Sequence, residues 1–142
     1  MRFPAAAITI ILLSGCDRVT EAYPTYTDAR SAGAVSRGWV PAFVPTSARD
    51  ISDSHDLDTS RQTLRFTVPV AQISAMVSGF ERIDHQASLD SFASKRGLGS
   101  ATQSWLVCAE PVSGVLSVAR DSGRAVYDTT FVWADSACSK RS

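Results

Sequence analysis

Beyond its first residues, the sequence has no hydrophobic run long enough to cross a membrane and no excess of charge of either sign. Basic and acidic side chains number 14 each, so composition gives no support for a nucleic-acid partner or for a strongly acidic one. No block of Lys and Arg occurs. Hydrophobic residues make up 44% of the 142 residues, which is ordinary for a globular domain and argues against a disordered chain.

Recognised motifs for catalysis and phosphate binding are also absent. Val112-Ser113-Gly114 lacks the first glycine of a Gly-x-Ser-x-Gly nucleophile elbow. Gly97-Leu98-Gly99 is not followed by a third glycine or by a Lys-Ser/Thr pair, so it does not make a phosphate-binding loop. The sequence therefore predicts no enzymatic activity, no cofactor and no nucleic-acid partner.

The N-terminal residues have the composition of a secretory signal. Arg2 precedes a short apolar stretch, residues 5–13, and the small residues Ser14-Gly15 lead to Cys16. A positive start, a short apolar core and small residues at the cleavage point are typical of such signals. The apolar stretch is shorter than the about 20 residues that a membrane-spanning helix needs. Together, Leu13-Ser14-Gly15-Cys16 resembles the lipobox of bacterial lipoproteins.

The resemblance to bacterial lipoproteins implies that residues 1–15 are removed and that Cys16 becomes an acylated first residue. Each buried methylene of an acyl chain adds about 0.8 kcal/mol, so two or three chains would anchor the protein durably on the periplasmic side of a membrane. Asp17 is similar to the inner-membrane retention signal of enteric bacteria. An ordinary secretory signal and an uncleaved anchor are the alternatives.

The two remaining cysteines form an even pair. Once Cys16 is assigned to lipid, Cys108 and Cys138 remain for an exported, oxidising compartment. We expect a disulfide between them, with two buried free thiols as the alternative. Their spacing matches neither a CxxC motif nor a zinc site, so no metal is predicted there.

The remaining chain is predicted to be a polar tether at residues 16–24 followed by one domain, residues 25–142. Thr25 and Asp28 have the spacing of a capping box and predict a helix from Tyr26 to Val35, with Gly38 near its end. The prolines of residues 39–45 exclude regular helix or central strand there. We expect Trp39, Phe43 and Val44 to anchor this extended segment in the core.

The fold class predicted is α+β, with two antiparallel hairpins forming a four-stranded sheet and one or two packed helices. Residues 51–57 and 62–68 predict the first hairpin, because apolar and polar residues alternate along the second of these segments. Val70, Ile73, Val77 and Phe80 recur at helical spacing and predict a helix over 70–80. A short helix is expected at 87–95. The final third predicts β segments at 104–109, 112–120 and 124–133.

A cluster of titratable residues lies in the first predicted hairpin, and it consists of Asp50, Asp53, His55, Asp56 and Asp58. Such residues could bind a divalent metal or share acid–base chemistry. Strand alternation, however, sends Asp53 and His55 to one face and Asp56 and Asp58 to the other. We therefore favour a solvated strand and turn in which Asp56 and Asp58 bond local amides. His55, Asp56 and Asp58 remain the candidate binding residues.

Residues 38–66 also carry a resemblance. The run Gly38-Trp39-Val40-Pro41, the step from Pro45 to Ile51, and the turn His55-Asp56-Leu57-Asp58-Thr59 precede a strand with Phe66. This pattern resembles a motif of small uncharacterised bacterial proteins, many of them lipoproteins. The resemblance implies no known activity.

Three functions are compatible with these observations. The favoured one is a non-enzymatic, membrane-anchored envelope module that binds an envelope protein or a cell-wall component, or that supports envelope structure. The second is an inhibitor of a hydrolase such as lysozyme. Ser122-Gly123 with Tyr127 is similar to the Ser-Gly loop and following tyrosine of some inhibitor lipoproteins. In this sequence the tyrosine lies one residue further on than in their motif. The third is a metal protein or enzyme using His55 with Asp56 or Asp58.

Overall fold

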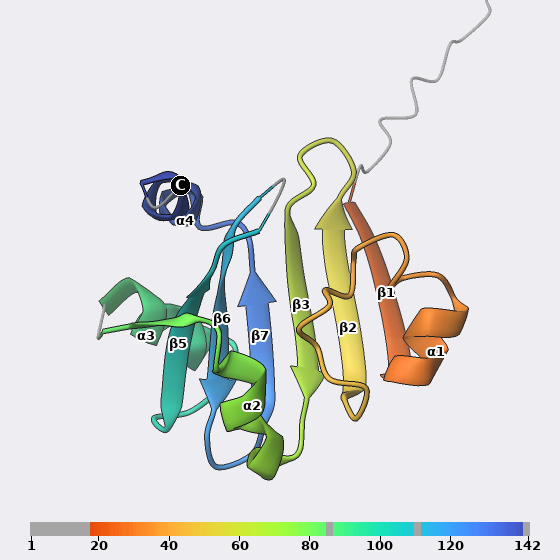
Figure 1. Cartoon of the computed structure of the whole chain (residues 1–142), viewed down its shortest axis with the longest axis horizontal. Helices are drawn as coiled ribbons and strands as arrows, with labels where there is room; N and C mark the ends of the chain where they lie inside the picture. The colour runs from red at the N-terminus through yellow and green to blue at the C-terminus, as the bar shows by residue number, and fades with distance from the viewer. Residues whose placement is uncertain (1–17, 85–86, 110–111, 141–142) are drawn as a thin grey trace, which may run out of the picture.

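The computed structural model describes residues 18–84, 87–109 and 112–140, so the expected leader and Cys16 lie outside the described residues. One seven-stranded antiparallel sheet runs through the molecule in the order β1-β2-β3-β7-β6-β5-β4 (Figure 1). Its strands are β1 (Arg18–Thr25), β2 (Arg49–Asp56), β3 (Gln62–Thr67), β4 (Glu81–Ile83), β5 (Thr102–Val107), β6 (Gly114–Ala119) and β7 (Arg124–Asp128). The helices are α1 (Tyr26–Ser31), α2 (Ile73–Val77), α3 (Ala87–Lys95) and α4 (Val132–Ser139).

The predicted tether is wrong for most of its length, because Arg18–Thr25 forms the edge strand β1. This strand pairs with β2 in antiparallel register, with Glu21 opposite Asp53 and Tyr23 opposite Ile51. Alternation along β1 places Tyr23 on the covered face of the sheet, where it is buried. The first described strand therefore begins at Arg18, two residues after Cys16 in the sequence.

The predicted capping box is confirmed at the start of α1. The Thr25 hydroxyl accepts from the Asp28 amide, and the Thr25 amide donates to the Asp28 carboxylate. The helix ends at Ser31 rather than Val35 because Gly33 takes a positive φ of 80°. Residues 32–48 then cross one face of the sheet as a series of turns, and they bury Val40 and Val44 against it. We call this segment the crossover.

The first hairpin and α3 are confirmed at their predicted places. The helix expected over 70–80 is instead a short 3-10 turn, Val70–Gln72, followed by α2. Ile73 and Val77 are buried as predicted, whereas Val70 is 50% exposed. Val70 therefore lies off the packed side because the 3-10 turn changes the angular spacing of side chains before α2 begins.

The last strand is shorter than predicted. β7 ends at Asp128, and the chain continues into α4 instead of extending to Trp133. The Asp128 carboxylate accepts from the amide of Thr130 at 2.8 Å, which turns the chain away from the sheet.

The predicted Cys108–Cys138 disulfide is present, with the two Cα atoms 5.5 Å apart, and it joins the end of β5 to α4.

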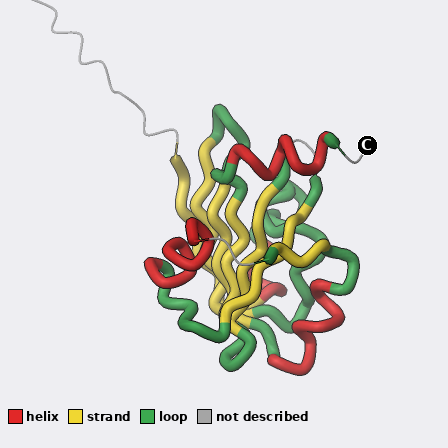
Figure 2. The backbone as a smooth tube through the Cα atoms, turned by 90° about the vertical axis from the view of Figure 1, so that its left-hand side faces the viewer, coloured by secondary structure: helices red, strands yellow, loops and turns green. Residues whose placement is uncertain are grey.

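The two halves of the molecule form one sheet and not two separate hairpins. β3 pairs with β7 from Thr63 opposite Asp128 to Thr67 opposite Arg124, so the expected four-stranded arrangement is wrong in strand number and in topology. The crossover and α2 lie on one side of the sheet and α3 lies on the other (Figure 2). Within the described ranges, no helix combines the length and the apolar character needed to span a membrane.

Candidate functional site

A buried acid–base pair lies on β2. Alternation along this strand turns Ile51, Asp53 and His55 toward the crossover, and the two polar residues are 0% and 2% exposed. The Asp53 Oδ2 and His55 Nδ1 atoms are directly hydrogen-bonded. Burial of a carboxyl group is unfavourable unless it is bonded, so this pair depends on its neighbours.

Two further residues complete the surroundings of the pair. The Trp39 ring stacks on the His55 ring with centroids 3.6 Å apart and planes 11° apart. With its amide nitrogen facing them, Gln62 donates to Asp53 Oδ1 and to the Trp39 carbonyl, each at 3.0 Å. Trp39, Asp53, His55 and Gln62 thus join the crossover to β2 and β3, and we call them the Asp53 cluster.

Glu21 on β1 lies beside this cluster. Its carboxylate, the Asp53 carboxylate and a His55 ring nitrogen offer ligand atoms within 4.8 Å of one another, and such groups can hold a divalent cation. Both Asp53 oxygens already take part in hydrogen bonds, however, and Glu21 forms an ion pair with Arg37 at 3.2 Å. The arrangement is therefore a hydrogen-bonded network that holds the crossover in place.

Burial sets the electrostatics of the Asp53 cluster. Loss of solvation raises the pKa of the Asp53 carboxyl from 3.8 to about 6, although the hydrogen bond and charge of His55 act in the opposite direction. Asp56, on the other face of β2, shows the reverse effect. Its pKa is lowered, chiefly because Thr59 donates hydrogen bonds to its carboxylate.

The raised pKa of Asp53 predicts a pH-dependent stability. The folded state holds this proton up to about pH 6, whereas the unfolded chain releases it near pH 3.8. Between these values the folded state binds more protons, so the free energy of unfolding decreases as the pH rises from about 4 to about 6. Asp53→Asn, which keeps the shape and mimics the protonated carboxyl, should remove this decrease. Urea denaturation at several pH values measures it.

Asp56→Asn is the matched control for this experiment. It removes a carboxylate from the solvated side of β2. Because the pKa of Asp56 is lowered from 3.8, this carboxyl group titrates below the tested pH range. Its pH profile between about 4 and about 6 should follow that of the unmodified protein. A profile that Asp53→Asn leaves unchanged would refute the assignment to Asp53.

A pocket of about 600 Å³ lies next to the Asp53 cluster. Phe43 is packed edge-on against both Phe80 and Tyr127, with ring centroids 5.3 and 5.1 Å away. These edge-on contacts are a favourable aromatic geometry and hold the walls in place. We call this the aromatic pocket, and its lining includes Arg37, Trp39, Phe43, Gln62, Phe80, Val107, Cys108, Tyr127 and Thr129.

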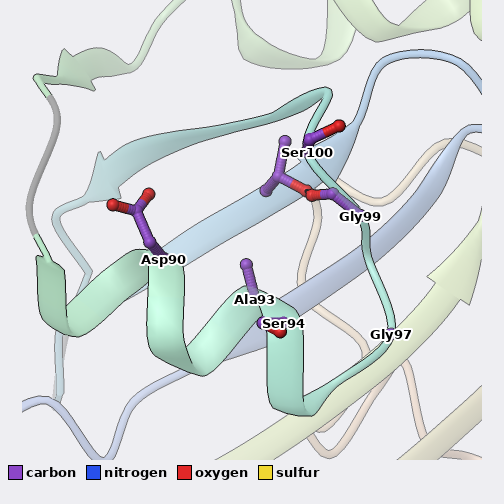
Figure 3. Close-up of a pocket in the computed structure, with 7 residues that line it drawn as sticks. Asp90, Ala93, Ser94, Gly97, Gly99 and Ser100 are labelled. Carbon is purple, nitrogen blue, oxygen red and sulfur yellow. Dashed lines mark hydrogen bonds between the residues drawn. The ribbon is translucent and has the colours of Figure 1, made fainter.

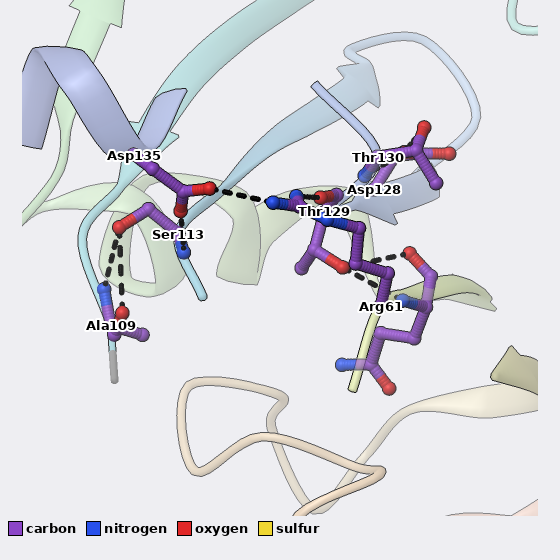
Figure 4. Close-up of polar contacts among 8 residues, drawn as sticks. Arg61, Ala109, Ser113, Asp128, Thr129, Thr130 and Asp135 are labelled. Carbon is purple, nitrogen blue, oxygen red and sulfur yellow. Dashed lines mark hydrogen bonds and ion pairs between the residues drawn. The ribbon is translucent and has the colours of Figure 1, made fainter. Parts of the chain in front are cut away.

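A polar network at the rim ties the pocket to α4 (Figure 4). Arg61 Nη2 donates to Asp135 Oδ2 at 2.8 Å, and the Ser113 amide donates to Asp135 Oδ1 at 2.7 Å. Arg61 also donates to the Thr129 carbonyl, and the Thr129 hydroxyl accepts from the backbone N–H of Gln62 at 2.7 Å. The hydrogen bond from Arg61, followed by that from the Ser113 amide, lowers the pKa of Asp135. One network therefore positions both Gln62 and α4.

A second hollow, of about 660 Å³, lies between α3 and the loop before β5 (Figure 3). Small side chains and glycines make up most of its lining, and Asp90 is the charged member; the residues are Asp90, Ala93, Ser94, Gly97, Gly99, Ser100 and Thr102. Binding pockets are usually lined by apolar and aromatic groups with a few placed polar groups. The aromatic pocket matches that description and this hollow does not.

The structure divides the predicted site residues as strand alternation requires. Asp56 and Asp58 lie away from Asp53 and His55, and the Asp56 carboxylate accepts from the amides of Asp58 and Thr59 at 3.1 and 2.8 Å. The prediction of a solvated strand is thus confirmed for Asp56 and wrong for Asp53 and His55, which are buried. Packing of the crossover excludes water from that face.

Sequence reasoning missed Gln62 as a partner of Asp53. Its position could have been found, because Gln62 shares one strand face with the apolar Leu64 and Phe66. Trp39 was expected in the core and instead lies between His55 and the aromatic pocket. Tyr127, considered for an inhibitor loop with Ser122 and Gly123, is 2% exposed and lines that pocket.

Comparison with known families relates the first part of the chain to a bacterial family. Residues 17–67 match the family model of the YbbD head domain. The match runs from β1 to β3 and contains residues 38–66 and the whole Asp53 cluster. The strands β4–β7 and the helices α2–α4 lie outside it. No curated protein and no solved structure matches the chain.

Proposed function

We propose that the protein is a lipid-anchored lipoprotein of the bacterial envelope whose domain binds another envelope component without chemically changing it. The observation that carries the binding role is the aromatic pocket, whose about 600 Å³ lies within the range of ligand pockets, roughly 300–1,000 Å³. The anchor is supported by the lipobox-like residues 13–16 and by the start of β1 at Arg18.

The chemistry of the aromatic pocket suits a flat group the size of one side chain or one sugar ring. Trp39 and Phe43 are partly exposed and offer aromatic surfaces, and such surfaces are enriched where proteins bind partners. Arg37 adds hydrogen-bond donors at the border. A protein segment or a cell-wall component of the envelope offers groups of this kind.

The Asp53 cluster supports a binding role over an enzymatic one. A catalytic histidine must reach the proton that it transfers, yet His55 is 2% exposed and covered by the Trp39 ring. The carboxylate of Asp53 is used to hold Gln62 and His55. These contacts hold one wall of the aromatic pocket.

Site-specific photo-crosslinking in living cells tests the pocket. Ala42 is exposed at the border of the aromatic pocket, so a benzophenone amino acid at position 42 should give a discrete crosslinked product. The same amino acid at Asp121, exposed in the turn between β6 and β7, is the control and should give none. A product that forms equally at both positions, or at neither, would contradict binding at the pocket.

Mass spectrometry of the membrane fraction tests the anchor separately. The mature chain should begin at Cys16 and carry acyl chains, and Cys16→Ala should abolish the acylation and release the protein from membranes. An unacylated chain that retains residues 1–15 would overturn the anchor and leave the pocket experiment valid.

A further inference from the structure

Among the described elements, α3 lies on the sheet face opposite the crossover, and it packs on β6 and β7 rather than on β1–β3. On this side, α3 and the following loop pack Ala93 and Leu98 onto Ala119 and Val126, which belong to β6 and β7. Beyond them, a depression of about 250 Å³ is lined by Arg18, Thr20, Ser52, Ser54, Thr63, Arg65 and Arg96. We call this surface the arginine face. It carries hydroxyl and guanidinium groups only.

Strand register explains how these side chains gather. Thr20 on β1 lies opposite Ser54 on β2, and Ser54 lies opposite Thr63 on β3, which makes a row of hydroxyls across three strands. The Thr20 hydroxyl donates to Ser54 at 3.3 Å. Arg65 is two residues along β3, and Arg96 reaches the row from the end of α3, where its guanidinium lies over the Phe92 ring at 5.2 Å.

The charge of the arginine face is offset only in part, because Arg18 lies opposite Asp56 and its charge helps to lower the pKa of that carboxyl. Over the part of the chain that the structure describes, Arg18, Arg65 and Arg96 form no ion pair with a carboxylate.

The two nearby acids have other partners. Asp56 accepts from the amides of Asp58 and Thr59, and Asp128 accepts from Thr63 and Thr130. Three guanidinium groups that form no ion pair within the described residues lie beside four hydroxyls. They form a surface complementary to phosphate, because the planar donor fork of arginine matches phosphate oxygens.

The position of Arg18 points to the source of that phosphate. Arg18 follows Cys16 by two residues, and an extended chain spans at most about 3.6 Å per residue. We propose that the arginine face docks on the anionic phospholipid headgroups of the membrane that holds the protein. This inference rests on the proposed anchor, since acyl chains on Cys16 would keep Arg18 within about 7 Å of the headgroups.

Vesicle binding without the acyl chains tests the docking. The protein used is the mature chain, residues 16–142 with Cys16→Ser, which contains every described strand and helix. It should cosediment with vesicles of phosphatidylglycerol and phosphatidylethanolamine and not with vesicles of phosphatidylcholine alone. Each basic residue near an anionic surface contributes about fivefold in binding, so R18Q/R65Q/R96Q should bind on the order of 100-fold more weakly.

A matched variant separates docking from net charge. R30Q/R82Q/R120Q removes the same charge from exposed positions outside the depression and should bind these vesicles within about threefold of the starting protein, because its contacts with the face are unchanged. Equal losses in both triple variants would overturn the proposal. Inorganic phosphate that displaces the protein at low millimolar concentration would overturn it also, because it would identify a soluble anion as the ligand.

The two proposals fail in different experiments. Vesicle binding that is independent of the arginine face refutes docking while the acyl mass on Cys16 stands. An unmodified Cys16 in cells refutes the anchor whatever the vesicles show.

Discussion

Replacing Gly123 with alanine is expected to lower the free energy of unfolding by about 3 kcal/mol. Gly123 lies in the turn between β6 and β7 with a φ of +74°, and an added Cβ would lie 1.9 Å from the Val68 carbonyl oxygen. That carbonyl belongs to backbone, which cannot move aside cheaply, because the Val68 amide donates to the Gly123 carbonyl at 2.9 Å. Urea denaturation measures the loss.

Gly79→Ala is the matched control. No atom lies within 4 Å of the position that its Cβ would occupy, and Gly79 has no positive φ. Its free energy of unfolding should stay within about 1 kcal/mol of that of the unmodified protein or rise slightly, since alanine restricts the unfolded chain. Equal midpoints for the two variants would refute the close approach of the β6–β7 turn to Val68.

Breaking the disulfide is expected to destabilise the domain by about 3–4 kcal/mol. Cys108 and Cys138 are 30 residues apart, and closing a loop of that length restricts the unfolded chain by about this amount in the chain-entropy model. Cys108→Ser with Cys138→Ser, and the unmodified protein under dithiothreitol, should show the same shift in urea midpoint. Because Cys108 also lines the aromatic pocket, the crosslink from position 42 should weaken in parallel.

Cys16→Ser gives the control for the disulfide experiment. Its cysteine precedes the first strand, Arg18–Thr25, so the midpoint of the non-acylated protein should not change. A midpoint insensitive to dithiothreitol, with both thiols shown to be reduced, would contradict a stabilising role of the disulfide. The comparison uses the folded domain alone and does not depend on acylation.

Local patterns predicted most of the elements correctly. The capping box at Thr25 and Asp28, the alternation over Gln62–Thr67 and the short helix Ala87–Lys95 are confirmed. These features depend on hydrogen bonds and side-chain periodicity within a few residues. The β1 strand, Arg18–Thr25, was missed because it lies at the edge of the sheet. An edge strand pairs with a single neighbour and buries few side chains, so its sequence shows little apolar alternation.

The candidate site was predicted only in part. Alternation correctly separated Asp53 and His55 from Asp56, yet their burial follows from the crossover, whose path depends on contacts with β2 and β3. The partnership of Gln62 with Asp53 and Trp39 joins segments distant in sequence. No local pattern encodes such a contact. The prolines and apolar residues of the crossover are compatible with many paths of the chain across the sheet.

The sequence by itself determined the local elements, the even pair of cysteines and which residues share a strand face, because these depend on spacing along the chain. Only the tertiary structure decided that β3 pairs with β7 to make one sheet, and that the crossover buries Asp53 and His55. It also brought Arg18, Arg65 and Arg96 together. Pairing between distant strands is chosen by the total surface that the whole chain can bury, and that quantity exists only once all the elements have packed.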